Sequence, residues 1–469
     1  MSPTSRIEHD FLGEKEIPQE AYYGVQTVRA LENFRITDIP ISIEPCMIQA
    51  LGFVKKAAAL ANMDLGVLPE EIGEAITAAC DEVIAGRLDD QFVVDVIQGG
   101  AGTSTNMNAN EVIANKALEI LGRAKGEYDA VHPNNHVNCS QSTNDAYPTA
   151  FRLALLLIIP KLAEAMHSLS DAFRAKAGEF SDVIKMGRTQ LQDAVPMTLG
   201  QEFGAFATTI GEDVDRLQTV QELFYEINLG ATAIGTGINA PAGYAPVAVD
   251  HLRRLTGFPL VSSSDLVEAT WDTGAYVQLS GLLRRFAVKL SKISNDLRLL
   301  SSGPRAGLNE INLPRLQPGS SIMPGKVNPV IPEVVNQIAF QVIGMDVTIT
   351  MASEAGQLQL NVMEPVIAFD LFQMLEMLQR GCYALETKCV SGITANREHC
   401  RNMVMNSIGI VTALNPVIGY ETSAAVAKEA LASGRSVYDL VLEKNLVSKE
   451  KLDRIFSIEN LMRPKYFRK

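Results

Sequence analysis

The segment Gly319–Pro329, GSSIMPGKVNP, gathers several chemically capable side chains into one short stretch. Ser320 and Ser321 carry hydroxyls, Lys326 carries a cation and Asn328 carries an amide. Gly and Pro interrupt helices, so this stretch is predicted to be a loop. A loop does not need Ser-Ser, Lys and Asn together, so the rest of the chain must indicate what these side chains do.

Three further stretches have the same polar character: GGAGTSTNMNANE (99–111), HPNNHVNCSQSTNDAYPT (132–149) and MGRTQLQDAVP (186–196). Helix capping is one interpretation, because Ser and Thr are good N-cap residues. The other is a shared site for a small ligand with two carboxylates, bound by helix N-termini, hydroxyls, amides and Lys326. The candidate residues in these stretches are Thr103, Ser142, Thr143, Asn144, Thr189 and Gln190.

Other motifs exclude several classes of site. The segment GATAIGTG contains G-x-x-x-x-G at Gly230–Gly235, but Thr-Gly follows where a phosphate-binding loop needs Lys and Ser or Thr. No G-x-S-x-G or H-E-x-x-H segment occurs. The six cysteines lack the paired Cys-x-x-Cys spacing of zinc sites, so reduced thiols are expected. Nothing in the sequence requires a cofactor.

The net charge of −13 over 469 residues argues against nucleic acid or an anionic membrane as the main partner. The N-terminal stretch is polar and lacks the apolar region of a signal peptide. The most apolar run, LALLLIIP at 153–160, is too short to span a bilayer. A cytoplasmic location is therefore expected.

Long helices are predicted to position these loops. Apolar residues recur at spacings of three and four over 199–227, 276–300 and 334–349. These stripes predict helices of about 25–30 residues, roughly 40 Å long, and the helices are expected to pack as a bundle. Stripes of this length also indicate contacts with other subunits.

The flanking regions contain shorter elements. A helix is predicted after Pro69, with Glu70 and Glu71 in its first turn and Gly86 past its end. Shorter, more polar helices follow residue 397, one of them beginning at Ser448. The predicted fold is mostly α in three parts: an N-terminal domain (1–140), a central bundle of long helices (141–396) and a small C-terminal helical domain (397–469).

The chain resembles the fumarase/aspartase superfamily almost from end to end. The resemblance is carried by GSSIMPGKVNP and by RIEHDFLGEKEIP, AYYGVQT, QGGAGTSTNMNANEV, QSTND, GRTQLQDAVP, LSSGPRAGLNEINLP and GQLQLNVMEPV. Fumarases typically have GRTH and QSSND, whereas this chain has Gln190 and Thr143 at the variable positions. The sequence therefore looks most like the aspartase branch of the superfamily.

This resemblance implies the reversible anti elimination of ammonia from L-aspartate to give fumarate. A base removes a proton beside the β-carboxylate, and the carbanion delocalises as an aci-carboxylate. Donors aimed at such developing charge contribute strongly to catalysis, about 10²–10³ in rate for one donor. By resemblance, Ser320 is the base.

The resemblance also assigns binding roles. The residues expected to hold the β-carboxylate are Thr103, Ser142, Thr143 and Ser321. The residues expected to hold the α-carboxylate are Lys326 and Asn328. The residues expected near the amino group are Asn144, Thr189 and Gln190. The glycines of the Ser320 loop would let it close over substrate.

Family members are homotetramers whose sites combine motifs from three subunits, and this assembly is expected here. Some members respond to Mg²⁺, so Mg²⁺ is kept as an activator although no Mg²⁺ motif is evident. The stretch His132–Asn135 resembles a second, non-catalytic dicarboxylate site of fumarases. Arg29, Arg188 and Arg305 are not included among the site residues, because each could equally fix loop geometry.

Two alternatives remain open from the sequence. One is a fumarase-like hydratase or a lyase for a related amino diacid, against which Gln190 argues. The other is a catalytically silent structural homologue, since lens crystallins arose within the superfamily. Damage to the loop would be expected in that case, but Ser320, Lys326 and Asn328 are all intact.

Overall fold

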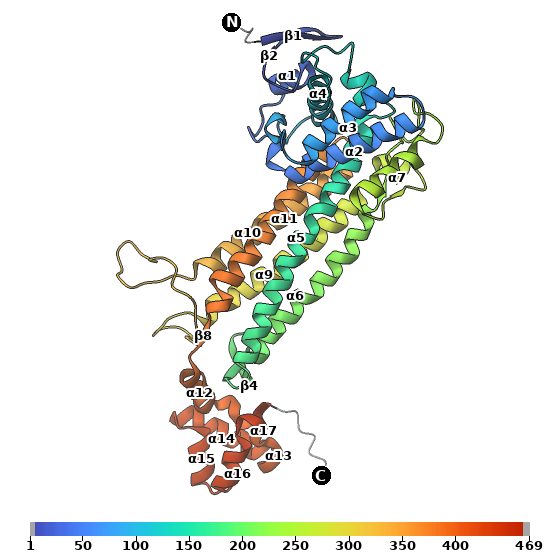
Figure 1. Cartoon of the computed structure of the whole chain (residues 1–469). Helices are drawn as coiled ribbons and strands as arrows, with labels where there is room; N and C mark the ends of the chain where they lie inside the picture. The colour runs from blue at the N-terminus through green and yellow to red at the C-terminus, as the bar shows by residue number, and fades with distance from the viewer. Residues whose placement is uncertain (1–4, 463–469) are drawn as a thin grey trace. The chain divides into compact units, whose positions relative to one another are not determined.

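The computed structural model describes residues 5–462 and is predominantly helical (Figure 1). The chain forms two compact units, each built from three separate segments. Unit 1 comprises the described parts of Met1–Ala163, Asp215–Arg285 and Gln341–Met377. Unit 2 comprises those of Glu164–Val214, Phe286–Phe340 and Leu378–Lys469. Each unit is discontinuous along the chain, whereas the three predicted domains are continuous segments. The boundaries of those domains stay a prediction.

Five long helices each contribute residues to both units. They are α5 (Thr143–Glu179), α6 (Leu199–Gln221), α9 (Gly274–Leu300), α10 (Val330–Glu354) and α11 (Glu364–Lys388). The predicted stripes are confirmed as helical in α6, α9 and α10, except that α6 ends at Gln221, so Phe224 and Ile227 of its predicted stripe lie beyond the helix. Every stripe residue of α9 from Tyr276 to Leu300 is buried. In α10 the buried row starts at Val335, whereas the predicted first member, Val334, is exposed.

Unit 1 is otherwise built from shorter helices and two small strand pairs. The pairs are β1 (Ser5–Asp10) with β2 (Gly13–Pro18), antiparallel, and β5 (Glu226–Ile227) with β6 (Val261–Ser262), parallel. Its other α-helices are α1 (Val25–Asn33), α2 (Pro45–Asp64), α3 (Glu70–Ile84), α4 (Thr103–Ile120), α7 (Tyr244–Thr256) and α8 (Glu268–Trp271). Helix α2 packs against α3 and α7, and α3 packs against α4.

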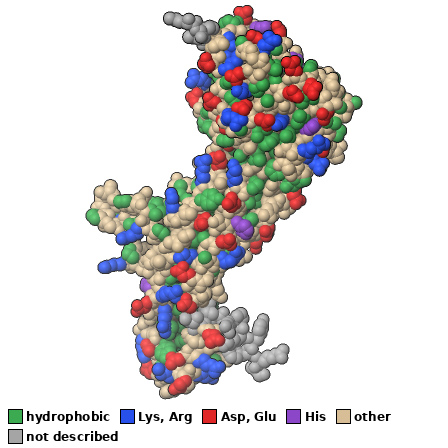
Figure 2. Space-filling model, viewed as in Figure 1, with side chains coloured by type: hydrophobic (Ala, Val, Ile, Leu, Met, Phe, Trp, Pro, Cys, Tyr) green, Lys and Arg blue, Asp and Glu red, His purple; other side chains and the backbone are tan. Residues whose placement is uncertain are grey.

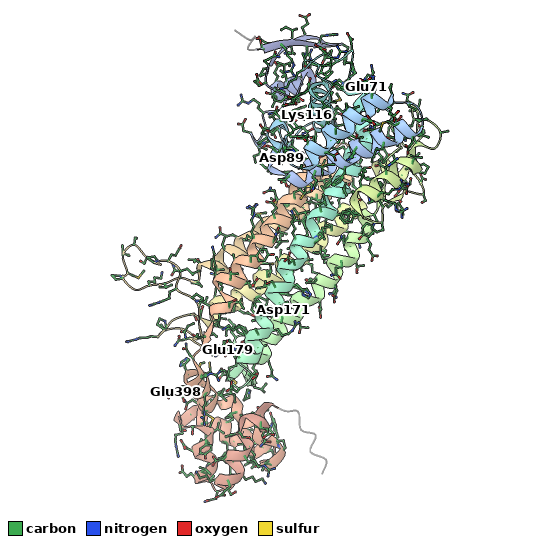
Figure 3. The ribbon with its side chains drawn as sticks, viewed as in Figure 1. Glu71, Asp89, Lys116, Asp171, Glu179 and Glu398 are labelled. Atoms are coloured by element: carbon green, nitrogen blue, oxygen red, sulfur yellow. The ribbon has the colours of Figure 1, made fainter. Side chains whose placement is uncertain are left out.

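Two predicted helix boundaries are confirmed. Helix α3 begins at Glu70 directly after Pro69, and the acidic residues of its first turn, including Glu71 in Figure 3, suit the positive end of the helix dipole. Gly86 follows its end with φ +73°, a left-handed conformation that glycine adopts without strain. Helix α16 (Lys449–Ile455) begins after Ser448, whose side chain accepts from the N–H of Lys451.

Unit 2 contains an antiparallel hairpin and a cluster of short C-terminal helices. Its strands are β3 (Ile184–Thr189) with β4 (Gln192–Thr198), and β7 (Ile311–Asn312) with β8 (Thr394–Ala395). Its short α-helices are α12 (Arg397–Asn406), α13 (Asn415–Ile418), α14 (Tyr420–Ser433), α15 (Val437–Glu443), α16 and α17 (Ile458–Met462). An apolar core joins these helices to Ile184 and Met186 of β3.

Apolar side chains reach the surface among the charged ones (Figure 2). On α10, Phe340, Val347 and Met351 are 62%, 55% and 67% exposed. This helix is long and apolar enough to cross a membrane by length and composition alone. In its middle, however, the buried Asp346 accepts from Arg284 and Ser280 of α9, which is typical of a helix packed within protein.

Glu364, the first residue of α11, is buried in unit 1, and burial raises the pKa of its carboxyl to about 8. The unfolded carboxyl has an ordinary pKa near 4.5, so the folded chain binds an extra proton between these two values. The contribution of Glu364 to the free energy of unfolding therefore falls as pH rises from about 4.5 to about 8.

We predict that Glu364→Gln removes this loss of stability, because the amide is neutral at every pH. The melting temperature of the variant minus that of the wild type should increase from pH 5 to pH 8. Differential scanning calorimetry at matched ionic strength measures this difference. A difference that stays constant with pH would show that Glu364 does not retain its proton in the fold.

Candidate active site

Thr103 is the first residue of α4, and the two residues before it have left-handed backbone conformations. Ala101 and Gly102 have φ +55° and +86°, and Gly102 is the N-cap. A Cβ on Gly102 would lie 2.5 Å from the ring of Tyr147 in α5, so only glycine fits. The Thr103 hydroxyl donates to the Gly100 carbonyl at 2.7 Å, and the side chain is exposed.

Ser142, Thr143 and Asn144 form the start of α5. The Ser142 Oγ accepts from the Asn144 N–H at 3.2 Å, so Ser142 is an N-cap, as its type predicts. The Thr143 Oγ1 accepts from Asn106 Nδ2 of α4 at 3.0 Å. The structure thus links the N-terminal turns of α4 and α5, and it leaves all three side chains partly exposed.

A proline inside α5 leaves the backbone carbonyl of Asn144 without its helical hydrogen bond. Pro148 has no N–H, so the Asn144 carbonyl four residues earlier lacks its helical donor. Asn228 Nδ2 supplies a donor to this carbonyl at 3.0 Å, and Asn144 Nδ2 donates to the Ala233 carbonyl at 2.8 Å. The segment GATAIGTG therefore lies against the start of α5, where it has a structural role.

Two buried charges lie beneath these residues. The carboxylate of Asp145 accepts from the N–H groups of Ser142, Gly230 and Thr232 at 2.9–3.0 Å, and burial raises its pKa to about 6. Lys55 of α2 is fully buried, and desolvation lowers its pKa to about 7, with the Asp145 charge opposing that shift. The charge of each group favours the ionised form of the other.

Lys55 is held by amides rather than by a direct carboxylate contact. Its Nζ lies 2.6 Å from Asn106 Oδ1, 3.0 Å from Asn138 Oδ1 and 2.9 Å from Gln141 Oε1. Sequence reasoning missed this cluster. The available signal was a lysine in an otherwise apolar helical stretch, LGFVKKAAALA, near the polar motifs in unit 1.

Thr189 and Gln190 lie on the β3–β4 hairpin of unit 2. Gln190 and Leu191 form its two-residue turn with φ +54° and +61°, values typical of a type I′ turn and unusual for residues other than Gly, Asn or Asp. The capping interpretation is wrong for Thr189, because the chain turns back as a strand there and no helix begins. Both side chains are exposed.

The base of this hairpin is fixed by a buried carboxylate. Glu310 is fully buried and pairs with Arg188 at 2.5 Å and with Lys185 at 2.8 Å. Arg29 likewise makes a two-pronged pair with Asp10 in unit 1. The interpretation of Arg29 and Arg188 as residues that fix local geometry is consistent with these contacts.

The Ser320 loop closes on itself in unit 2. The Gly319 N–H donates to the Lys326 carbonyl at 2.7 Å, and Asn328 Nδ2 donates to the Gly319 carbonyl at 2.8 Å. A Cβ on Gly319 would lie 2.8 Å from the backbone of residues 326 and 328, so this closure needs glycine. The segment is an exposed loop between α9 and α10 in Figure 1.

The hydroxyl of Ser320 is the most chemically informative atom in the loop. Its Oγ accepts from the N–H of Ile322 at 3.2 Å and from the N–H of Met323 at 2.9 Å. Two backbone donors favour the ionised form of a hydroxyl, which is the requirement for a serine base. Ser321 and Lys326 are exposed beside it.

The predicted site residues thus fall into two groups. Unit 1 brings together the starts of α4 and α5, with Thr103, Ser142, Thr143 and Asn144. Unit 2 holds the hairpin with Thr189 and Gln190 and the loop with Ser320, Ser321, Lys326 and Asn328. Their assignment to substrate stays a prediction.

The His132–Asn135 stretch enters a short π-helix, Pro133–Val137. His132 Nδ1 accepts from the N–H groups of Asn134 and Asn135 at 3.0 and 3.3 Å, and His136 Nδ1 accepts from the His132 N–H at 2.9 Å. Burial lowers the pKa of both rings. Each neutral ring therefore carries its proton on Nε2, and a second dicarboxylate site here stays a prediction.

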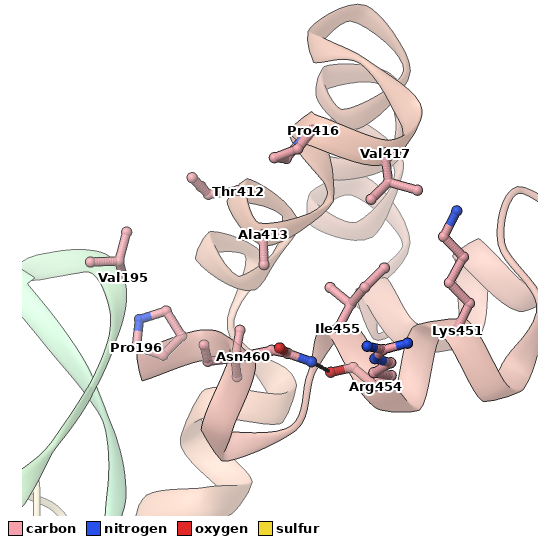
Figure 4. Close-up of a pocket in the computed structure, with 11 residues that line it drawn as sticks. Val195, Pro196, Thr412, Ala413, Pro416, Val417, Lys451, Arg454, Ile455 and Asn460 are labelled. Atoms are coloured by element: carbon pink, nitrogen blue, oxygen red, sulfur yellow. Dashed lines mark hydrogen bonds between the residues drawn. The ribbon is translucent and has the colours of Figure 1, made fainter. Parts of the chain in front are cut away.

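A separate cavity of about 470 Å³ lies in unit 2 between strand β4 and the C-terminal helices (Figure 4). Its lining is mainly apolar, with Val195, Val417 and Ile455, and includes Lys451 and Arg454. None of the predicted site residues lines it. Between residues 5 and 462 no group of three or more His, Cys, Asp or Glu side chains could hold a metal ion.

Comparisons with known proteins identify the class. A family model described as "Lyase" matches residues 13–344, and one described as "Fumarase C C-terminus" matches residues 410–463. The chain belongs to the fumarase/aspartase superfamily.

Two similar curated relatives are both aspartate ammonia-lyases. The chain is 61% identical to the aspartate ammonia-lyase of Pseudomonas aeruginosa, over 99% of each chain. It is 59% identical to that of Escherichia coli, over 99% of this chain and 98% of the relative.

Solved structures agree in fold. A protein from Brucella melitensis, named "fumarate lyase:delta crystallin" and bound to cobalt, is 57% identical with a TM-score of 0.95. The match covers 97% of this chain and 99% of that one. A class II fumarase from Schistosoma mansoni is 36% identical with a TM-score of 0.91, over 97% and 98% of the two chains. The predicted mostly α fold is confirmed.

We predict that Gly102→Ala lowers the melting temperature by more than Gly122→Ala. Both glycines have positive φ, which costs alanine roughly 1–2 kcal/mol, but Gly122 has open space around it whereas Gly102 contacts Tyr147. Thermal unfolding followed by circular dichroism gives the difference. Equal shifts in the two variants would show that the Tyr147 contact can relax without cost.

Proposed function

We propose that this protein is an aspartate ammonia-lyase that converts L-aspartate reversibly to fumarate and ammonia. The observation that carries the proposal is the identity of about 60% with aspartate ammonia-lyases over essentially the whole chain. The loop with Ser320, Lys326 and Asn328 is intact, which argues against a catalytically silent homologue.

The reaction begins at the carbon beside the β-carboxylate of aspartate. Ser320, ionised with support from two backbone N–H groups, removes a proton from this carbon, and the C–H electron pair moves into the carboxylate. The resulting aci-carboxylate collapses to form the double bond of fumarate. The C–N bond breaks in that step, and its electron pair leaves with ammonia.

The aci-carboxylate carries extra negative charge and needs hydrogen-bond donors. Hydroxyls of Thr103, Ser142, Thr143 and Ser321 are proposed to supply them, since fixed donors aimed at developing charge stabilise such a transition state most strongly. Lys326 and Asn328 bind the α-carboxylate, and Asn144, Thr189 and Gln190 lie near the amino group. Asn328 already uses its Nδ2 within the loop, so its Oδ1 and second N–H hydrogen remain for other contacts.

A fumarase-like hydratase is the second candidate, and the likeness to the Schistosoma fumarase favours it. Gln190 argues against it, because glutamine donates and accepts hydrogen bonds but does not transfer protons at neutral pH. A related amino-diacid lyase differs only in the substituent that its site admits.

The working form is proposed to be a homotetramer with sites built from three subunits. Two features support this. The exposed apolar row on α10 needs a partner surface, and the exposed Ser320 loop needs a substrate pocket completed by other elements. No cofactor is proposed as necessary. Mg²⁺ is proposed as an activator, and no step of the reaction uses a metal. The enzyme is proposed to be cytoplasmic.

We predict fumarate from L-aspartate and none from L-malate when the purified protein is followed by ultraviolet absorbance. Ser320→Ala should abolish aspartate turnover, because alanine cannot accept the proton. Size-exclusion chromatography and circular dichroism check that the variant keeps its fold.

Fumarate from malate instead would assign the protein to the hydratase branch. Aspartate turnover retained by Ser320→Ala would keep the function but remove Ser320 as the base.

We predict that Met351→Glu weakens the tetramer, because it places a charge in the exposed apolar row of α10. Leu431→Glu is the matched control, since Leu431 is 74% exposed and belongs to a different helix, α14. Sedimentation velocity should show dissociation for Met351→Glu alone. An intact tetramer in both variants would exclude this part of α10 as an interface.

A further inference from the structure

We propose that Lys55 and Asn106 form a buried hydrogen-bond relay that forces the Thr143 hydroxyl to be a donor into the substrate site. The proposal rests on the proposed function and adds two positioning residues to it. Neither residue needs to touch the substrate. Their role is to set the direction of a hydroxyl that does.

The relay starts from Lys55 in its protonated form. The Lys55 ammonium carries no acceptor, so each amide facing it must present oxygen. Its three contacts are therefore Asn106 Oδ1, Asn138 Oδ1 and Gln141 Oε1, at 2.6–3.0 Å. Three acceptors for one ammonium group match its three hydrogens. The orientation of each amide follows from this contact.

The next step transfers this orientation to α5. Because Asn106 Oδ1 faces Lys55, its Nδ2 must face the opposite way, toward Thr143 Oγ1 at 3.0 Å and Asn138 Oδ1 at 3.2 Å. An amide nitrogen only donates. The Thr143 oxygen must therefore accept, and its one hydrogen must point elsewhere.

The last step concerns where that hydrogen goes. Within residues 5–462 the structure shows no hydrogen bond donated by Thr143 Oγ1, and the side chain is partly exposed beside Ser142. The proton is therefore available to a carboxylate oxygen. A hydroxyl fixed in this direction needs no reorientation when negative charge develops on the substrate, which is the condition for effective stabilisation.

Buried charge keeps the relay in place. Asn106 and Lys55 are buried, and Asp145 provides the opposing negative charge without a direct contact to Lys55. Cys80, the other titratable group that affects Lys55, is fully buried with a pKa raised to about 12 and stays neutral. The relay thus begins at the buried amine of Lys55 and ends at the partly exposed hydroxyl of Thr143.

The test is a double-mutant cycle between Asn106→Asp and Thr143→Val. In Asn106→Asp the carboxylate accepts from both Lys55 and Thr143, so the hydroxyl turns inward and presents its lone pairs to the substrate. We expect each single variant to lower kcat by about 10²–10³, with a smaller rise in KM. In the Thr143→Val background, Asn106→Asp should lower kcat by a further factor of less than about three, since no hydroxyl remains to be turned.

Two results would overturn the relay. One is an equal loss of kcat from Asn106→Asp in both backgrounds, which would mean that the new charge acts directly on the substrate. The other is full activity in either single variant. Asn108→Asp is the matched control, because Asn108 is a buried amide on the same helix that bonds to the backbone of residues 91 and 93 instead. We expect it to leave kcat unchanged.

Folding and function are checked separately. If Asn106→Asp fails to fold, Asn106→Ala replaces it. Freeing the hydroxyl to rotate should then lower kcat by less than Thr143→Val does, again with little further effect in the Thr143→Val background. If wild type does not turn over aspartate, the proposed function fails, and the same cycle is measured by calorimetric binding of fumarate. A loss of affinity confined to backgrounds with Thr143 supports the relay, and an equal loss in both overturns it.

Discussion

The carboxylate of Asp145 fixes the start of α5, and the positions of the predicted site residues on that turn depend on this contact. It accepts from one N–H of its own helix turn and from two in the Gly230–Thr232 segment. Ser142, Thr143 and Asn144 therefore sit on a turn that is held from outside as well as by its helix. Burying a carboxylate is costly unless it is compensated. Lys55 supplies the charge, and backbone donors supply the bonds.

The two groups of predicted site residues are held in different ways. In unit 1 the polar side chains stand on helix starts, anchored by a buried network that leaves little freedom. In unit 2 the Ser320 loop is exposed and gains its shape from contacts within itself, chiefly between Gly319, Lys326 and Asn328. A rigid set of predicted binding residues and a predicted base on a loop would suit a reaction in which substrate enters before the base approaches.

The sequence predicts the helices that obey simple periodicity or capping rules. The stripes of α6 and α9, the start of α3 after Pro69 and the Ser448 cap all follow from local chemistry. Helix α5 was not predicted, because Pro148 and Pro160 lie inside it, and only a tertiary donor from Asn228 compensates for the first. The Thr189 turn was also missed, since Gln190 and Leu191 are not typical of positive φ.

The predicted site residues are polar members of motifs, such as Ser320 and Thr143, and their assignment to substrate stays a prediction. Lys55 lies in none of these motifs, and Asn106 lies in one without having been singled out. The role of both depends on which acceptor each donor meets, and that depends on the contacts among α2, α4 and the start of α5. Hydrogen-bond direction is a property of a network that local sequence does not encode.

The interleaved make-up of the two units has a consequence for biosynthesis. The last segment of unit 1 ends at Met377, so about four-fifths of the 469 residues must leave the ribosome before either unit can be completed. The nascent chain therefore carries α5 and α6 with their apolar faces uncovered until the later segments emerge. Slow translation of the last part of the message would prolong that exposure.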